Sequence, residues 1–165
     1  QPQHMIEFTY DLIKNNKLTF EKSNNDHRVV TFHDSCNVAR GSNMGNIENG
    51  QFILPREVIK AACNNFIDMP KNTIKSATFC CGGGGGLLTD DLIDLRIKGA
   101  KPRMHALRKS EQESGVNTLA AICAICKSQF SKVLPNYDFD PYMVVSVHQL
   151  VSDAIVLKHK LKQKD

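Results

Sequence analysis

The 165-residue chain contains no tryptophan, and aromatic residues make up only 7% of it. Surfaces that stack nucleic-acid bases need exposed aromatic side chains, so this shortage argues against a nucleic-acid partner. The sequence also lacks an apolar run approaching the roughly 20 residues that span a bilayer, and no export signal is recognisable. We therefore expect no direct membrane span and a reducing, cytoplasmic setting for the cysteines.

Charge of one sign is also scarce, because the formal net charge is only +4. Most of it comes from four lysines near the carboxyl end, where we expect a solvated helix end. The hydrophobic content of 41% and the charged content of 23% are those of a globular protein. We expect a single domain over residues 1–165. The chain begins at Gln1 and not at Met, so we also expect it to be a piece of a longer protein.

The informative residues are the cysteines, of which there are six. Five follow one pattern: Cys36 alone, the adjacent pair Cys80 and Cys81 before five glycines, and Cys123 and Cys126 as a Cys-x-x-Cys step. Thiolates are soft ligands, and iron–sulfur clusters are held by several of them at once. This order of cysteines favours an iron–sulfur site.

Short apolar runs alternate with segments of helical periodicity along the chain. They predict strands at 28–33, 73–79, 118–122 and 142–147. They predict helices from Met5 to near Asn15 and Asn16, from Pro55 to about 67, from 89 to 114 with an interruption at Gly99 and Pro102, from 123 to 135, and at 149–161. Strands that alternate with helices indicate an α/β fold with a parallel sheet of about four strands and flanking helices.

In such a sheet the five cysteines follow strand ends. Cys36 comes just after the first predicted strand, Cys80 and Cys81 end the second, and Cys123 ends the third, with Cys126 in the next helical turn. The carboxyl ends of parallel strands meet at one edge, where open α/β folds bind ligands. We therefore expect the cysteines to gather at the carboxyl edge of the strands.

The glycine run belongs to the same expected site. Gly82, Gly83 and Gly84 would let the backbone pass close to a bulky cofactor and turn N–H groups toward it. A phosphate-binding loop is a weaker interpretation, because no Lys-Ser or Lys-Thr follows the glycines.

Two histidines are candidates for moving protons, each with a purely structural alternative. His33 precedes the first cysteine of the pattern, and His148 ends the fourth predicted strand at the same sheet edge. The sixth cysteine, Cys63, shares a helical stripe with Ile59 and Phe66, and we expect it in the hydrophobic core and not among the ligands.

Three other functions compete with that of an iron–sulfur reductase. Four cysteines suit a tetrahedral zinc module, which would leave a fifth cysteine unused. A thiol–disulfide oxidoreductase would use Cys123 and Cys126 at a helix start but not Cys36 or the pair. An electron-transfer scaffold without a substrate of its own would share the cluster, and only activity on a disulfide separates it from a reductase.

At this point the residues resemble a known family. His33-Asp-Ser-Cys36-Asn-Val-Ala-Arg40, Phe79-Cys-Cys-Gly82 and Cys123-Ala-Ile-Cys-Lys127 are similar to the cysteine-rich CCG domain of heterodisulfide reductases, with DsrK-type subunits the nearest in character. The resemblance covers nearly the whole chain and would make it the carboxyl-terminal part of such a subunit.

The resemblance implies a 4Fe-4S cluster of the noncubane type, held by Cys36, Cys80, Cys81, Cys123 and Cys126. It implies reduction of a disulfide or trisulfide on a DsrC-like sulfur-carrier protein, in a complex with quinol-linked membrane subunits at the inner face of the cytoplasmic membrane. The gaps between the cysteines are longer than is usual in heterodisulfide reductase itself and suit the DsrK type. No C-x₂-C-x₂-C-x₃-C ferredoxin motif is present, so the electron supply is expected upstream.

Overall fold

The computed structural model describes residues 2–87 and 89–157. Within this part of the chain three parallel strands form one sheet, in the order β1 (Val30–His33), β2 (Thr118–Ala121) and β3 (Val144–Ser146). His33 pairs with Ala121, and Ala121 with Ser146, so all three strands end at one edge. The predicted α/β class with a parallel sheet and flanking helices is confirmed.

The predicted strand count is wrong: the sheet has three strands, because 73–79 does not join it. This segment instead forms two short 3-10 turns, Lys71–Thr73 and Lys75–Ala77. Its backbone groups bond to side chains and not to a neighbouring strand: the amide of Lys75 donates to Asp34 at 2.8 Å, and Arg40 donates to the carbonyl oxygens of Ser76 and Thr78 at 3.2 and 3.0 Å. Apolar residues alone could not distinguish this loop from a strand.

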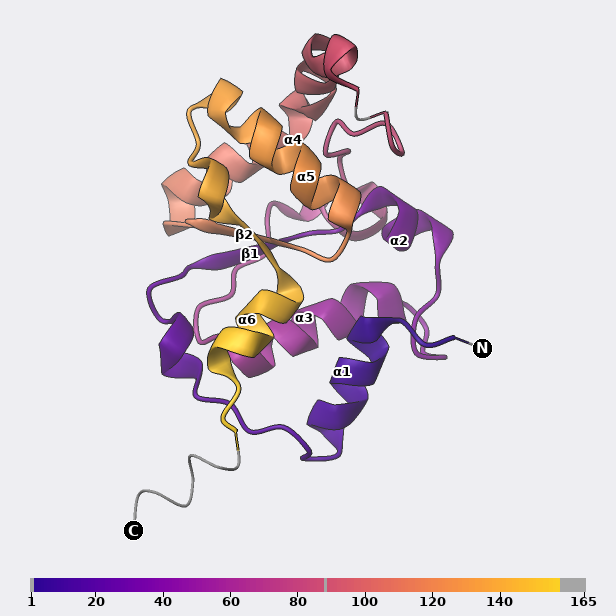
Figure 1. Ribbon diagram of the computed structural model, residues 1–165, viewed down its shortest axis with the longest axis vertical. Coiled ribbons are helices and arrows are strands. Elements are labelled where there is room, and N and C mark those ends of the chain that lie inside the picture. The colour runs from indigo at the N-terminus through magenta and orange to yellow at the C-terminus, as the bar shows by residue number, and fades with distance from the viewer. Residues whose placement is uncertain (1, 88, 158–165) are drawn as a thin grey trace.

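Helices lie on both sides of the sheet (Figure 1). α4 and α5 cover one side, while α1, α3 and α6 cover the other, and the short α2 lies beyond the carboxyl ends of the strands. Their bounds are α1 Met5–Lys14, α2 Cys36–Gly41, α3 Gly50–Ala62, α4 Ile93–Ser114, α5 Ala124–Val133 and α6 Val147–Ala154.

Several helix bounds differ from those predicted. α3 begins at Gly50 with Pro55 inside it, and α4 is continuous through Gly99 and Pro102. Packing of one buried face of α4 outweighs the local cost of these two residues, because most helical stability in proteins comes from tertiary burial. α6 ends at Ala154, so the predicted closing helix is too long; residues 158–161, like the lysine-rich end, lie outside the described residues.

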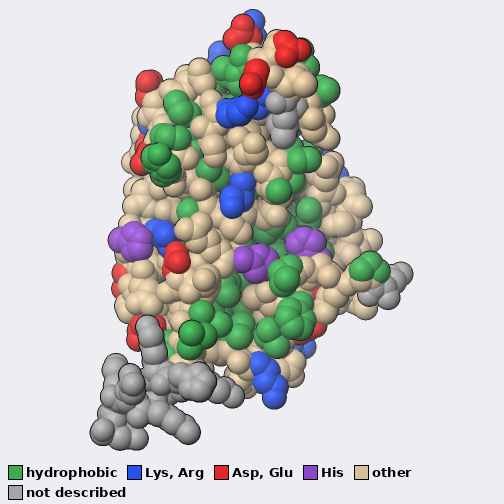
Figure 2. All heavy atoms as spheres, in the orientation of Figure 1, with side chains coloured by type: hydrophobic (Ala, Val, Ile, Leu, Met, Phe, Trp, Pro, Cys, Tyr) green, Lys and Arg blue, Asp and Glu red, His purple; other side chains and the backbone are tan. Residues whose placement is uncertain are grey.

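Two hydrophobic clusters, one on each face of the sheet, form the core. The first joins α1, α3 and α6 and contains Phe32 and Cys63; the second joins α4 and α5 and contains Cys81, Cys126 and Phe130. On the molecular face of Figure 2, acidic and basic side chains are interspersed, as expected from the small net charge. None of the described helices is both long and apolar enough to cross a membrane.

Candidate metal centre

Two helices, α2 and α5, begin close to the carboxyl ends of the strands. His33 ends β1, Ser35 is the N-cap of α2, and Cys36 is its first residue. After β2, Cys123 is the N-cap of α5, which places Cys126 in the first helical turn. Since both strands end at one edge, the expectation that cysteines from distant parts of the sequence gather there is confirmed.

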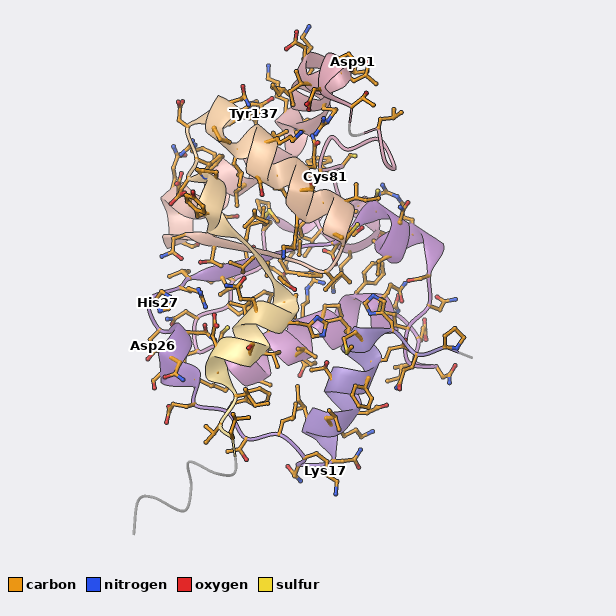
Figure 3. The ribbon with its side chains drawn as sticks, in the orientation of Figure 1. Lys17, Asp26, His27, Cys81, Asp91 and Tyr137 are labelled. Carbon is orange, nitrogen blue, oxygen red and sulfur yellow. The ribbon has the colours of Figure 1, made fainter. Side chains whose placement is uncertain are left out.

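Four thiols influence one another's ionisation at this edge: Cys81 acts on the pKa of Cys80, and Cys126 acts on the pKa of both Cys81 and Cys123. The Cys126 thiol donates to the hydroxyl of Ser35 at 3.7 Å, which connects the residue before Cys36 to the group. Figure 3 shows Cys81 in the half of the molecule that contains α4 and α5.

His33 is the residue that the fold adds to the thiols. Its ligating atom and the sulfurs of Cys81 and Cys126 all lie within 4.8 Å of one another. The ring is fully buried, stands edge-on to Phe130 at 4.8 Å between centroids, and neither nitrogen has a hydrogen-bond partner. Burial, helped by the nearby charge of Arg103, holds the pKa of His33 well below its usual value, so the ring is neutral.

The surroundings shift the pKa values of the thiols in opposite directions. The neighbouring Cys126 thiol, with burial, raises the pKa of Cys81 to about 12, and the neighbouring Cys81 thiol, with burial, raises the pKa of Cys80 further. Burial opposes ionisation of Cys123 too, but the backbone N–H of Cys126 and the hydroxyl of Ser35 outweigh it and lower its pKa. The thiols of this group become thiolates together when they bind a metal cation, because metal ligation deprotonates thiols.

The glycine run lies directly against the sulfurs. The amide of Gly82 donates to the Cys80 sulfur at 3.3 Å, and the backbone N–H groups of Gly84 and Gly83 favour the ionised forms of Cys80 and Cys81 and so act to lower their pKa values. Gly82 has φ +89°, and a Cβ there would lie 2.3 Å from the carbonyl oxygen of Arg96. Only glycine fits this position, so the run is a constrained backbone turn that aims N–H groups at thiols.

Two buried arginines, which were not identified from the sequence, bind the chain segments that lead to Cys36 and Cys80. Arg56 on α3 donates to Asp34 through two bonds of 2.8 Å and to Asp68 at 2.9 and 3.0 Å, which fixes the loop between β1 and Cys36. Arg103 on α4 is fully buried and contacts the segment before Cys80. Their positions on the apolar faces of the two helices, such as Arg103 between Ala100 and Leu107, were the available sequence signal.

The other predicted residues lie apart from the thiols. His148 is in the first turn of α6, where its Nε2 lies 3.2 Å from the hydroxyl of Thr9 on α1. Burial lowers the pKa of His148, and His4 adds to this effect. Cys63 lies in the opposite hydrophobic cluster, as predicted, and burial raises the pKa of its thiol to about 11.

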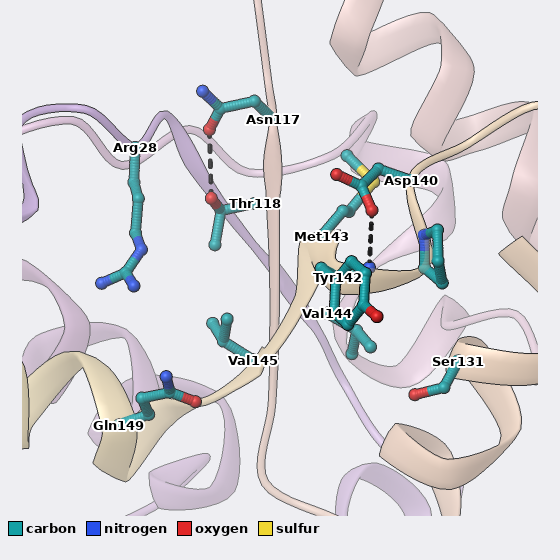
Figure 4. Close-up of a pocket in the computed structure, with 11 residues that line it drawn as sticks. Arg28, Asn117, Thr118, Ser131, Asp140, Tyr142, Met143, Val144, Val145 and Gln149 are labelled. Carbon is teal, nitrogen blue, oxygen red and sulfur yellow. Dashed lines mark hydrogen bonds between the residues drawn. The ribbon is translucent and has the colours of Figure 1, made fainter.

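Two hollows lie at opposite ends of the sheet. The first, of about 200 Å³, is mainly apolar and reaches Cys80 between Leu87, Leu95 and Gly99. The second, of about 400 Å³, lies at the amino ends of the strands, where Asn117 and Thr118 begin β2 (Figure 4). Only the first gives access to a thiol of the group.

The donor set fits an iron–sulfur cluster. The group consists of soft thiols and a neutral imidazole, its buried ring nitrogens have no partner within the protein, and backbone N–H groups point at the sulfurs. Oxygen ligands, which hard cations prefer, are absent from the group of His33, Cys81 and Cys126 found among the described residues. A parallel α/β domain with such a thiol group at the carboxyl edge of its strands is a cysteine-rich metal-binding domain.

Comparison with known proteins specifies the family. The pattern of the family described as "Cysteine-rich domain" (CCG) matches residues 30–131, more than half of the chain and a range that includes all five cysteines. The chain therefore belongs to the CCG cysteine-rich domain family, as the sequence resemblance indicated. No solved structure matches it significantly.

Similar proteins include an iron–sulfur subunit of a menaquinol oxidoreductase and a subunit of a heterodisulfide reductase. The chain is 46% identical over 154 residues to "Hdr-like menaquinol oxidoreductase iron-sulfur subunit 2" of Archaeoglobus fulgidus, covering 93% of this chain and 26% of that protein. It is 31% identical over 158 residues to one component of the dihydromethanophenazine:CoB–CoM heterodisulfide reductase of Methanosarcina mazei, covering 95% and 34%. The chain thus spans about a quarter to a third of the length of these relatives.

Proposed function

We propose that this chain is the iron–sulfur redox domain of a heterodisulfide-reductase-like subunit. It would hold a 4Fe-4S cluster of the noncubane type through Cys36, Cys80, Cys81, Cys123 and Cys126. The observation that carries the proposal is the group of His33, Cys81 and Cys126 at one sheet edge, whose ligating atoms lie within 4.8 Å of one another, with Cys80 and Cys123 acting on the ionisation of its thiols. Cys36, the first residue of α2, would be the fifth ligand.

The substrate we propose is a disulfide or trisulfide on a DsrC-like sulfur-carrier protein, with the whole subunit of the DsrK type. The printed names of the Archaeoglobus and Methanosarcina relatives, a menaquinol oxidoreductase and a heterodisulfide reductase, support redox chemistry linked to quinol or to a sulfur–sulfur bond. We further propose that quinol-linked membrane subunits hold the domain at the inner face of the cytoplasmic membrane and supply its electrons.

The residues of this chain would bind the substrate and move protons. The apolar hollow beside Cys80 would admit a sulfur-bearing arm, which would lie against its leucine side chains. The amides of Gly82, Gly83 and Gly84 stabilise negative charge on the cysteine sulfurs. When bound, the cluster supplies single electrons and iron that is soft enough to bind sulfur.

The proton for the departing thiol comes from one of the two histidines in this proposal. His33 lies beside the sulfurs but is neutral and has no bonded donor, whereas His148 is only half-buried and bonded to Thr9. His33 therefore lies where the departing thiolate would form, but its neutral ring would first have to take up a proton brought in with the substrate or solvent; His148 is the histidine that can exchange a proton with solvent.

A second candidate, a thiol–disulfide oxidoreductase, is favoured by the environment of Cys123. This thiol is the N-cap of α5 and has a lowered pKa, while Cys126 three residues later is buried, as in attacking and resolving pairs. It leaves the Cys80–Cys81 pair and the glycine amides without a role.

Anaerobic purification followed by iron and acid-labile sulfide assays tests the proposal. We expect iron and sulfide in similar amounts and a brown protein. Stoichiometric zinc without sulfide would establish the zinc module instead, and a metal-free protein that reduces disulfides through Cys123 would establish the second candidate.

A further inference from the structure

Arg103 on α4 is a buried cation without an anionic partner. Its exposed fraction is 0%, and none of the ion pairs among the described residues involves it. Its guanidinium donates to the carbonyl oxygen of Thr73 at 2.5 Å and the hydroxyl of Thr78 at 2.9 Å, and contacts the sulfur of Met69 at 2.9 Å. Its Nε has no acceptor. Neutral acceptors alone do not offset the cost of burying a full charge.

Arg56, buried to a similar degree, has the opposite arrangement. It is paired with Asp34 and Asp68, and these two carboxylates outweigh the effect of burial and raise its pKa. For Arg103 burial dominates, and its pKa is lowered to about 10 although Asp34 and the nearby thiols oppose the shift. Asp34 is already held by two bonds from Arg56. One buried arginine thus has its counter-charge within the protein, and the other does not.

The missing counter-charge has an evident place. The thiols that act on Arg103 electrostatically are Cys81, Cys126 and Cys80, which are three of the proposed ligands. Arg103 also bonds to Thr78 and lies over the ring of Phe79 at 5.8 Å, the two residues that lead into the Cys-Cys-Gly step. When a metal binds, these thiols become thiolates, and negative charge appears beside the guanidinium.

We propose that Arg103 is the internal counter-charge of the thiolate-bound cluster and raises its reduction potential. A one-electron reduction adds one negative charge to the site, and a fixed cation in a poorly screened interior stabilises the reduced form more than the oxidised form. Arg103 thereby helps the cluster accept electrons. The inference rests on the proposed cluster, and it gives Arg103 a positioning and electrostatic role, not a catalytic one.

The test is a redox titration of the anaerobically purified chain, followed by the cluster's spectrum. Arg103→Gln removes the charge but keeps hydrogen-bonding groups, and Arg103→Lys keeps the charge on a different shape. We expect Arg103→Gln to lower the ratio of reduced to oxidised cluster at a fixed potential at least tenfold, which is a shift of the reduction potential by about 59 mV toward negative values. Arg103→Lys should keep most of the wild-type reduction potential. Arg108→Gln, on the same helix but paired with Glu111, is the matched control and should leave the potential unchanged.

The outcomes separate this inference from the proposed function. Absence of iron and sulfide in the wild-type chain would defeat the proposed function itself. A loaded Arg103→Gln variant with the wild-type potential, or a Lys variant shifted as far as Gln, would overturn the role of the charge alone. If Arg103→Gln does not take up the cluster, the stability of the cluster-free variants decides the question. The inference requires cluster-free Arg103→Gln to be at least as stable as cluster-free Arg103→Lys, because without thiolates the positive charge has no partner. An Arg103→Gln variant that unfolds while Arg103→Lys folds would also overturn the inference.

Discussion

On the face of the sheet covered by α1, α3 and α6, most buried polar groups have partners inside the protein, with Gln51 Oε1 on α3 as an exception, whereas around the thiols on the α4 and α5 face several do not. Arg56 is bound by two carboxylates, and Asn25 donates to two carbonyl oxygens at 3.0 Å. Around the thiols, both nitrogens of His33, the Nε of Arg103 and the Nε2 of Gln129 have no acceptor or donor. Buried polar groups are normally satisfied, so their concentration around the thiols marks that face as the one that receives a cofactor.

The cysteines show the same contrast. Cys63 packs among aliphatic side chains of the first cluster, where it acts as a small hydrophobic residue. Cys81 and Cys126 are as buried, but their sulfurs and a ring nitrogen of His33 lie within 4.8 Å of one another. Burial alone therefore does not distinguish a core cysteine from a ligand; the neighbouring donors do.

The largest expected effect compares Cys81→Ser with Cys63→Ser. Loss of the Cys81 thiolate should remove most of the bound iron, whereas Cys63→Ser should leave the iron content unchanged and cost about 1–3 kcal/mol of stability through its buried hydroxyl. Iron analysis and urea unfolding measure the two effects. If Cys63→Ser strips iron as fully as Cys81→Ser, the division between the two faces is incorrect.

The next effect concerns the buried arginines in the cluster-free chain. Arg56→Met should lower the free energy of unfolding by about 3–5 kcal/mol, because it leaves Asp34 buried and unpaired. Arg103→Met should cost less, since it removes a cation that has no ion-pair partner among the described residues. Urea unfolding measures both, and Lys60→Met, an exposed α3 residue paired with Glu57, should change stability by no more than about 0.5 kcal/mol. Equal losses at Arg56 and Arg103 would count against the contrast.

A smaller effect on stability is expected from alanine substitution of two glycines that contact each other, Gly82 and Gly99. Gly82→Ala should cost about 1–2 kcal/mol for its left-handed backbone and about 1–3 kcal/mol for the overlap with the Arg96 carbonyl. Gly99→Ala faces Gly82 at an ordinary contact distance of 3.7 Å inside α4 and should stabilise the chain by about 0.5–1 kcal/mol. Thermal unfolding of the two variants measures the difference, and a Gly82→Ala chain as stable as wild type would show that the turn is not constrained.

The smallest effect is a pH dependence of the cluster-free chain. The folded pKa of His33 is lowered, so the unfolded chain binds a proton below about pH 6.5 that the folded chain does not. Stability is then complete above that pH and declines below it, with a slope approaching about 1.4 kcal/mol per pH unit. His33→Gln should flatten this decline, and His27→Gln, at an exposed position, should retain it. An unchanged slope in His33→Gln would place the titrating group elsewhere.

Local pattern was sufficient for part of the fold and for the identity of the thiols. The period of apolar residues predicted α1 and α5, the parallel connections, and the gathering of Cys36, Cys123 and Cys126 near one sheet edge. The five-cysteine ligand set stays a prediction, although four of its thiols act on one another's pKa at one edge of the sheet. These inferences succeeded because helical period and βα connectivity are encoded by neighbouring residues.

The segment 73–79 shows where local pattern fails. Its apolar residues predicted a strand, but its backbone is bonded by Asp34, Arg40 and Arg103, which come from three distant parts of the chain. β-propensity reflects fit to a half-buried surface and gives way to such tertiary partners.

The sequence by itself therefore determined which residue types this protein can offer to a metal and the order in which strands and helices present them. Only the tertiary structure decided that His33 and not His148 lies beside the sulfurs, and that Arg103 lies buried close to them without an ion-pair partner among the described residues. The reason is physical: residue types are local properties, whereas burial, charge pairing and hydrogen-bond partners depend on which distant segments the folded chain brings together.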